Sequence, residues 1–134
     1  LGFALAPFFR FPGGASNQVA HAYGGKHIMR DITEYVKERG YHYIEWNVSA
    51  EDTTEHRNDR KRLISNVLNG CKGKDLAVAL FHDTAQNAST AEVLPEIITT
   101  LKEWGYTFKT FDEISEEEME KMLDLHIMDM PIKK

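Results

Sequence analysis

The fold of this chain is decided by the stretch Leu76-Ala77-Val78-Ala79-Leu80-Phe81, which is followed directly by His82-Asp83. Six consecutive apolar residues are too few to cross a membrane and are typical of a strand that is buried on both faces of a parallel sheet. Polar chemistry in such sheets gathers at the carboxyl ends of the strands. The polar pair after this run therefore marks the place where a site is expected.

Outward from this run, the chain alternates between strand-like segments and the 3.6-residue period of amphipathic helices. The pattern predicts further strands over residues 8–11, 41–48 and 106–111. It predicts helices over residues 26–39, 59–68, 91–104 and 116–123, with loops at 15–25, 49–58 and 83–89. Thr90 and Ser115 are the expected N-caps, Asn69-Gly70 is the expected helix end, and Pro95 is expected in the first turn or two. A β-α-β-α-β-α-β-α order predicts an α/β fold with a parallel sheet.

Size and charge narrow the classes of function. The 134 residues are the size of one domain, and we expect a single partial domain over 1–134 whose residues 124–134 form a frayed tail. A net charge of −5 argues against a nucleic-acid partner or an anionic membrane surface. We see no membrane span and no signal peptide. Cys71 is the single cysteine, so no intrachain disulfide or multi-cysteine zinc site can form, and its role stays open.

Three charged or titratable residues are candidates for chemistry. His82 follows a rigid strand and suits a general acid or base, although His82-Asp83 could also be an ordinary loop pair. Arg10 ends an aromatic strand and needs an anionic partner, in a site or in a structural salt bridge. Asp52 lies in the loop after the next strand, where it could tune an imidazole or simply be a solvated loop acid.

Other positions are open to two interpretations. Gly13-Gly14 permits close approach of backbone N–H groups to a ligand, or forms a plain turn. Trp46 lines a sugar subsite or fills the core. The histidines show no metal-ligand spacing, so we expect no metal site in this chain.

Three motifs in order resemble those of the polysaccharide deacetylase family (the NodB-homology domain, carbohydrate esterase family 4). Arg10-Phe11-Pro12-Gly13-Gly14 resembles the R-x-P-x-G motif, and residues 46–52 (WNVSAED) resemble W-[DN]-V-D-x-x-D. Residues 78–83 (VALFHD) resemble L-x-L-x-H-D, and the leucine-proline pair at 94–95 precedes Gly105-Tyr106-Thr107-Phe108 as in the family's closing helix and strand. The resemblance covers about Pro7 to Ile114.

The resemblance implies a fold and a reaction. The fold would be the C-terminal half of a distorted (β/α) barrel with parallel strands alternating with helices. The reaction would be metal-dependent hydrolysis of acetyl groups on N-acetylated sugar polymers such as peptidoglycan or chitin. A divalent metal, most often zinc, would bind in the parent protein, which would be extracellular or in the cell envelope. A non-catalytic carbohydrate-binding domain of the same fold, or an unrelated α/β domain, are the alternatives.

The resemblance also assigns roles to residues. His82 would be the general acid, with Asp52 tuning it, and Arg10 would orient a base aspartate. Pro12, Gly13, Gly14, Trp46 and Leu80 would bind substrate, with the backbone near Gly13 holding the oxyanion and Leu80 facing the acetyl methyl group. Asp83 would not contact the substrate itself but would support the residues that do.

The sequence also departs from the family pattern. The Asp-Asp and H-[ST]-x-x-H motifs, which supply the base and the metal ligands, are absent, so we expect the isolated chain to be inactive and to self-associate or pair with a missing half. Gly13 replaces a common Tyr, Ser49 a common Asp and Thr53 a common Trp.

Overall fold

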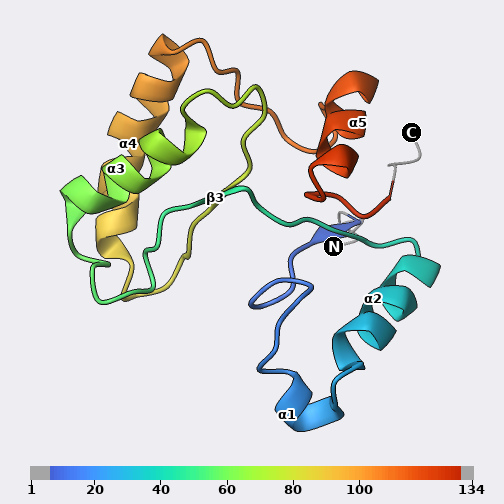
Figure 1. Ribbon diagram of the computed structural model, residues 1–134. Coiled ribbons are helices and arrows are strands. Elements are labelled where there is room, and N and C mark those ends of the chain that lie inside the picture. The colour runs from blue at the N-terminus through green and yellow to red at the C-terminus, as the bar shows by residue number, and fades with distance from the viewer. Residues whose placement is uncertain (1–6, 131–134) are drawn as a thin grey trace, which may run out of the picture. The chain divides into compact units, whose positions relative to one another are not determined.

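The computed structural model describes residues 7–130, which form two compact units. Unit 1 comprises the chain up to Glu45 and from Phe111 onward, and unit 2 comprises Trp46–Thr110. Figure 1 shows the helices and strands along the chain. Each unit contains one pair of parallel strands together with helices, so the α/β class predicted from the sequence is confirmed.

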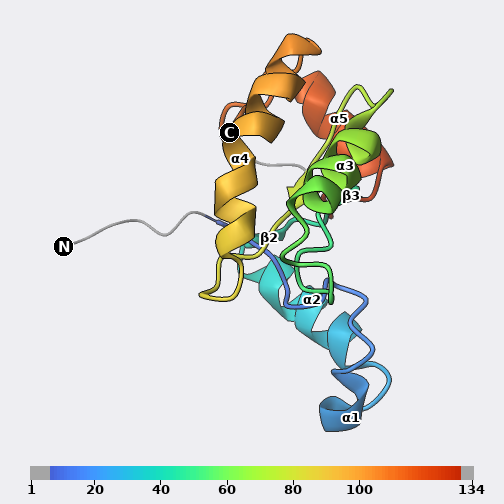
Figure 2. The same ribbon diagram turned by 90° about the vertical axis from the view of Figure 1, so that its left-hand side faces the viewer.

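The first part of unit 1 pairs a short strand with the strand that follows its helices. Strand β1 (Phe8–Phe9) lies parallel to β2 (His42–Tyr43), with Phe8 opposite His42 and Phe9 opposite Tyr43. Helix α2 (Ile28–Glu38) agrees with the predicted helix apart from its ends. Helix α1 (His21–Gly24) lies just before α2, as Figure 2 shows, where only a loop was predicted. It is a single turn, too short to show a helical period in the sequence.

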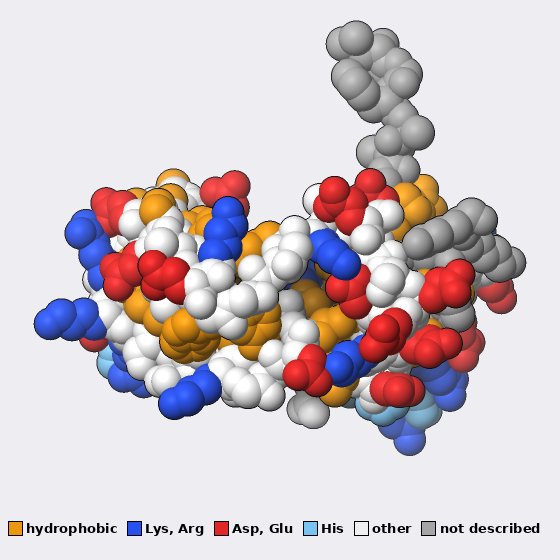
Figure 3. Space-filling view, turned by 90° about the horizontal axis from the view of Figure 1, so that it is seen from above, with side chains coloured by type: hydrophobic (Ala, Val, Ile, Leu, Met, Phe, Trp, Pro, Cys, Tyr) orange, Lys and Arg blue, Asp and Glu red, His pale blue; other side chains and the backbone are white. Residues whose placement is uncertain are grey.

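The last part of unit 1 is helix α5 (Glu116–Asp124) and the segment after it. Ser115 and Glu118 form a capping box, which confirms the predicted N-cap. Three acids occupy the first turn of α5, and acidic side chains are frequent on the surface of this unit in Figure 3. The tail was expected to be frayed, but Ile127 and Met128 are buried and Met128 forms a bridge with Ile44. Residues 131–134 lie outside the described residues.

Unit 2 places two helices against a second pair of parallel strands. Strand β3 (Val48–Ser49) pairs with β4 (Ala79–Leu80) in the register Val48 to Ala79 and Ser49 to Leu80. Helices α3 (Arg60–Cys71) and α4 (Ala88–Glu103) pack against each other (Figure 1). The core of the unit combines strand and helix residues: Val48, Ala50, Leu63, Val67, Cys71, Val93, Ile97 and Leu101.

Gly70 explains why α3 continues past its predicted end. A Cβ atom at this position would lie 2.8 Å from Cγ1 of Val48, so only glycine allows the helix to approach β3 this closely. The helix therefore uses Gly70 for packing and ends later, at Cys71. Asp59 caps its beginning by accepting a hydrogen bond from the Arg62 N–H at 3.0 Å.

The strand predicted over residues 41–48 is interrupted between β2 and β3. The side chain of Asn47 takes over pairing that a backbone would normally make: Oδ1 accepts from the Val78 N–H at 2.8 Å, and Nδ2 donates to the Leu76 carbonyl at 3.0 Å. The residues around Asn47 have high β-propensity, but the backbone hydrogen bonds of the ladder do not run through them without a break.

The apolar run Leu76–Phe81 was predicted to be buried on both faces, and this is wrong for the described structure. All six residues are half-buried, and only Ala79–Leu80 is strand. Ala77, Ala79 and Phe81 pack against the helix-covered core, so alternate residues point to the other face. One face of β4 is therefore covered by the helices of unit 2, and the other carries Leu80.

Three further predictions in unit 2 are wrong. Residues 106–111 form no strand; the Tyr106 hydroxyl instead lies between the carbonyls of Cys71 and Lys74, which share its one hydrogen, and Phe108 is half-exposed. Aromatic residues raise strand propensity only where a neighbouring strand accepts them. Thr90 is not the N-cap of α4, because the helix begins at Ala88, and Pro95 lies inside the helix beyond its first turns.

Candidate functional site

Parallel pairing of β3 and β4 brings the loops that follow these strands together. The Ala50 N–H donates to the Leu80 carbonyl at 3.1 Å, which is the last backbone contact of the ladder. The Ala50 carbonyl then accepts from Nδ2 of Asn66, and the His82 N–H donates to Oδ2 of Asp52 at 2.8 Å. Side chains thus replace the next ladder bonds, which ends the sheet at the point where Asp52 and His82 meet.

Asp52 and His82 form a close pair, although 30 residues separate them in the chain. Oδ1 of Asp52 lies 2.8 Å from Nδ1 of His82, in addition to the bond from the His82 backbone. The Thr90 hydroxyl donates to Oδ2 of Asp52 at 3.0 Å. The Asp52 side chain is 1% exposed and that of His82 is 38% exposed. The imidazole is therefore anchored on one edge and open to solvent on the other.

The hydrogen bonds determine the charge state of this pair. Burial would raise the pKa of Asp52, but the bonds from the His82 backbone, the His82 ring and the Thr90 hydroxyl together hold the pKa of this carboxyl below its ordinary value. An ionised carboxylate can only accept, so Nδ1 of His82 must carry the hydrogen in this bond. Asp52 thereby fixes the tautomer and the orientation of the ring, with Nε2 at the opposite edge.

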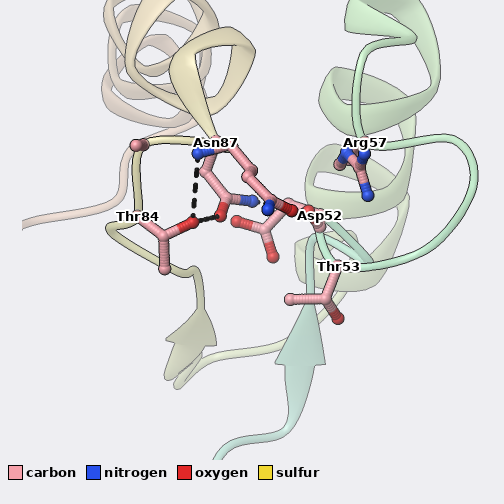
Figure 4. Close-up of a pocket in the computed structure, with 7 residues that line it drawn as sticks. Asp52, Thr53, Arg57, Thr84 and Asn87 are labelled. Atoms are coloured by element: carbon pink, nitrogen blue, oxygen red, sulfur yellow. Dashed lines mark hydrogen bonds between the residues drawn. The ribbon is translucent and has the colours of Figure 1, made fainter.

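The loop after β4 holds the Asp52 backbone as well. Asn87 donates from Nδ2 to the Asp52 carbonyl at 2.5 Å, and the Thr84 hydroxyl donates to Oδ1 of Asn87 at 2.5 Å, as Figure 4 shows. Asn87 precedes α4 but its side chain makes no capping bond, because it is used in this way. Glu51, the residue before Asp52, has a φ of 58°, a conformation that residues other than glycine rarely adopt.

The sequence did not single out Thr84, Asn87 or Thr90 as parts of this site. Their types are ordinary in a loop and at a helix start, and Thr90 was interpreted as a cap for that reason. The available signal was indirect: in a parallel sheet, polar residues just after one strand face those just after its neighbour. That rule would have placed the loop at 83–89 beside Asp52.

The other predicted residues of unit 2 differ in their surroundings. Leu80 is the last residue of β4 and points to the face opposite Ala79 and Phe81, which pack against the core of unit 2. Trp46 is half-buried, and Asp83 is exposed.

Arg10 lies in unit 1 and is held by backbone. Its Nε donates to the Ile44 carbonyl at 3.1 Å and its Nη2 to the Glu45 carbonyl at 3.3 Å. Burial lowers the pKa of Arg10, and the Glu45 carboxylate opposes that shift. These bonds to the backbone just after β2 fix the orientation of the Arg10 guanidinium. Its convergence with Asp52 and His82 stays a prediction, because those residues belong to the other unit.

The turn after Arg10 requires its glycines. Gly13 has a φ of 73° and Gly14 a φ of 80°, and the Gly14 N–H closes the turn by donating to the Phe11 carbonyl at 2.9 Å. A Cβ at position 13 would lie 3.0 Å from the Asn17 side chain, which itself donates to the Pro12 carbonyl. This backbone explains why glycine stands at position 13. The role of the Gly13 N–H as a donor to a ligand stays a prediction.

A metal ion needs several donor groups that converge on one point. Among residues 7–130, no three His, Cys, Asp or Glu side chains come together in a way that could hold a metal ion. The Asp52–His82 pair alone provides two such groups, and they bond each other. The described residues therefore do not fit a metal centre. In the same part of the chain, no helix has the length and apolar character that crossing a membrane requires.

Two known proteins are similar to this chain, and no family model matches it. The bifunctional xylanase/deacetylase of Pseudobutyrivibrio xylanivorans is 35% identical over 68 residues, which are 51% of this chain and 11% of that protein. The crystal structure of the catalytic domain of peptidoglycan N-acetylglucosamine deacetylase from Eubacterium rectale ATCC 33656 matches with a TM-score of 0.68 and 32% identity. The match covers 80% of this chain and 48% of that one, so this chain spans about half of the solved domain.

Proposed function

We propose that this chain carries a polysaccharide deacetylase domain and that the protein hydrolyses acetyl groups from N-acetylated sugar polymers, with His82 as the general acid. The observation that carries the proposal is the Asp52–His82 pair, with its two bonds of 2.8 Å. The names of both similar proteins support the substrate class, since one is a xylanase/deacetylase and the other a peptidoglycan N-acetylglucosamine deacetylase.

The geometry of the pair suits the difficult step of amide hydrolysis. Water adds to the acetyl carbon, the C–N bond breaks, and the products are acetate and an amine. An amine leaves readily only when its nitrogen is protonated as the bond breaks. Protonated His82 can deliver that proton from Nε2, because the Asp52 carboxylate accepts the Nδ1–H and fixes the orientation of the ring.

The remaining roles come from the family resemblance. Leu80, on the same strand face as His82, would contact the acetyl methyl group, and Asp83 and Trp46 would support the site. Arg10 would orient a base aspartate, and the Gly13 N–H in the Pro12–Gly14 turn would hold the developing oxyanion. We propose that the divalent metal binds to the longer protein through ligands outside the described residues, and that the fold completes a (β/α) barrel there. A cell-envelope location and self-association of the isolated chain belong to the same proposal.

The test is a deacetylation assay of the full-length protein with chito-oligosaccharides. His82→Ala should lower kcat by about 10²- to 10⁴-fold, the usual contribution of a positioned general acid. His82→Asn is expected to be similarly slow, although its amide can still bond Asp52. The matched control is His56→Ala, because its side chain is 37% exposed and also lies beside an acid, Glu55.

The pH profile separates chemistry from folding. Loss of a general acid should remove the fall of kcat on the alkaline side, whereas a folding defect would lower kcat at every pH. A fully active His82→Ala protein would refute the proposed role. A wild-type protein that binds the oligosaccharide without turnover would instead favour a carbohydrate-binding domain of the same fold.

A further inference from the structure

A cavity of about 410 Å³ lies beside the Asp52–His82 pair, entirely within unit 2. It opens between the loop after β3 and the loop after β4, with Arg57 on the first loop and Thr84 and Asn87 on the second, as Figure 4 shows. Polar side chains belong to six of its seven lining residues, which are Asp52, Thr53, Arg57, Thr84, Ala85, Gln86 and Asn87. The volume is within the range of small-molecule sites. Because Asp52 lies in the wall, the cavity adjoins the group that anchors His82.

Arg57 is the cation of this lining, and its guanidinium is uncommitted. Its backbone N–H donates to the Thr54 carbonyl, but its exposed side chain has no ion-pair or hydrogen-bond partner among the described residues. Two other arginines show the contrast, since Arg60 pairs with Glu92 and Arg39 donates to the Tyr35 carbonyl. The Arg57 guanidinium on the cavity wall can therefore bind an anionic ligand.

The acidic groups around Arg57 are already occupied. Asp52 accepts three hydrogen bonds from His82 and Thr90. Glu55 pairs with His56 at 3.2 Å, and Asp59 caps α3. None of these carboxylates pairs with Arg57 in the described structure, so the positive charge of Arg57 remains available to a ligand.

We propose that this cavity is a subsite for a sugar residue that bears a carboxylate, with Arg57 as the group that recognises it. A guanidinium binds a planar carboxylate through two parallel hydrogen bonds, which gives both charge and direction. A doubly charged phosphate fits less well, because Arg57 is the only Lys or Arg in the cavity lining and the Asp52 carboxylate shares the wall. Thr53 and Gln86 add neutral polar groups for sugar hydroxyls.

The subsite rests on the proposed function, since it holds the neighbour of the acetylated sugar whose nitrogen His82 would protonate. It adds a substrate class: polymers in which an N-acetylated sugar adjoins an acidic one. A neutral polymer such as chitin would lack the contact with Arg57. The contact is charge-assisted and is worth roughly tenfold or more in affinity.

The test uses two probes that differ only in charge. A hyaluronan tetrasaccharide alternates N-acetylglucosamine with glucuronic acid, and its carboxyl-reduced form is the neutral match. Calorimetric titration of the protein should show about tenfold tighter binding of the acidic form. Arg57→Gln should abolish that preference, and Arg57→Lys should retain only part of it, because lysine keeps the charge without the two-pronged geometry.

Arg62→Gln is the control, since it removes an exposed arginine five positions along and should keep the preference intact. The backbone amides of Thr53, Arg57 and Gln86 should shift in NMR spectra with the acidic probe. Equal binding of the two probes, binding of neither, or a preference that survives Arg57→Gln would each overturn the subsite. If the subsite fails but His82→Ala is slow, the deacetylase proposal stands. If His82→Ala is fully active but the preference for the acidic probe depends on Arg57, the subsite stands and only the role of His82 as general acid is refuted.

Discussion

The two units surround the buried carboxylate oxygens of an aspartate in opposite ways. In unit 2, Asp52 is 1% exposed and accepts bonds from the His82 backbone, the His82 ring and Thr90. In unit 1, both carboxylate oxygens of Asp129 are buried and have no hydrogen-bond partner among residues 7–130. The same holds within these residues for Nδ1 of His42 on β2, which is also buried.

The contrast is between a buried carboxylate with hydrogen-bond donors around it and one without them among the described residues. A satisfied buried carboxylate orders the groups around it, here the imidazole and two loops. An unsatisfied one lowers stability, because its lost hydration is not replaced. The candidate site therefore lies where buried polar groups of unit 2 are satisfied by hydrogen bonds from the same unit. Three predictions test this comparison.

The largest effect is expected at Asp52. Asp52→Ala leaves the His82 N–H and the Thr90 hydroxyl without their acceptor and should lower the free energy of unfolding by about 3 kcal/mol. Urea denaturation followed by circular dichroism measures it. Asp83→Ala, at an exposed aspartate one residue after His82, should change stability by less than about 0.5 kcal/mol. A loss below about 1 kcal/mol at Asp52 would mean that the network is not a structural unit.

A change of opposite sign is expected at Asp129. Asp129→Asn removes a buried charge without altering the shape of the side chain, so the free energy of unfolding should rise by about 1 kcal/mol. Asp124→Asn, at an exposed position of the same unit, serves as the control and should be close to neutral. If Asp129→Asn were destabilising, the carboxylate would have a partner in solution, and the contrast between the units would disappear.

The smallest effect is a dependence on pH. Since the pKa of Asp52 is lowered in the folded protein, its stabilisation is present above the ordinary aspartate pKa of about 3.9 and is lost as the pH falls towards the folded value. Thermal unfolding between pH 6 and pH 2.5 should thus show a difference between wild type and Asp52→Asn that shrinks below about pH 4. A constant difference would place the stabilisation outside the ionised carboxylate.

Local features were predictable because short-range physics produces them. The N-cap at Ser115 and the amphipathic period of α2 both depend on residues within a few positions. Distant partners decided the outcome elsewhere, as for the strand predicted at 106–111, which does not form. Tyr106 there bonds carbonyls more than 30 residues away rather than a neighbouring strand.

The sequence by itself determined the order of the motifs, and with it the relation to deacetylases and the choice of His82 and Asp52. Only the tertiary structure decided that Asp52 is held by Thr90, that Asn87 holds a loop instead of a helix, and that Arg57 borders a cavity. The physical reason is the strand register. Once Ser49 lies opposite Leu80, the loops that follow must meet, and no local pattern in either loop records which side chains then come within bonding distance.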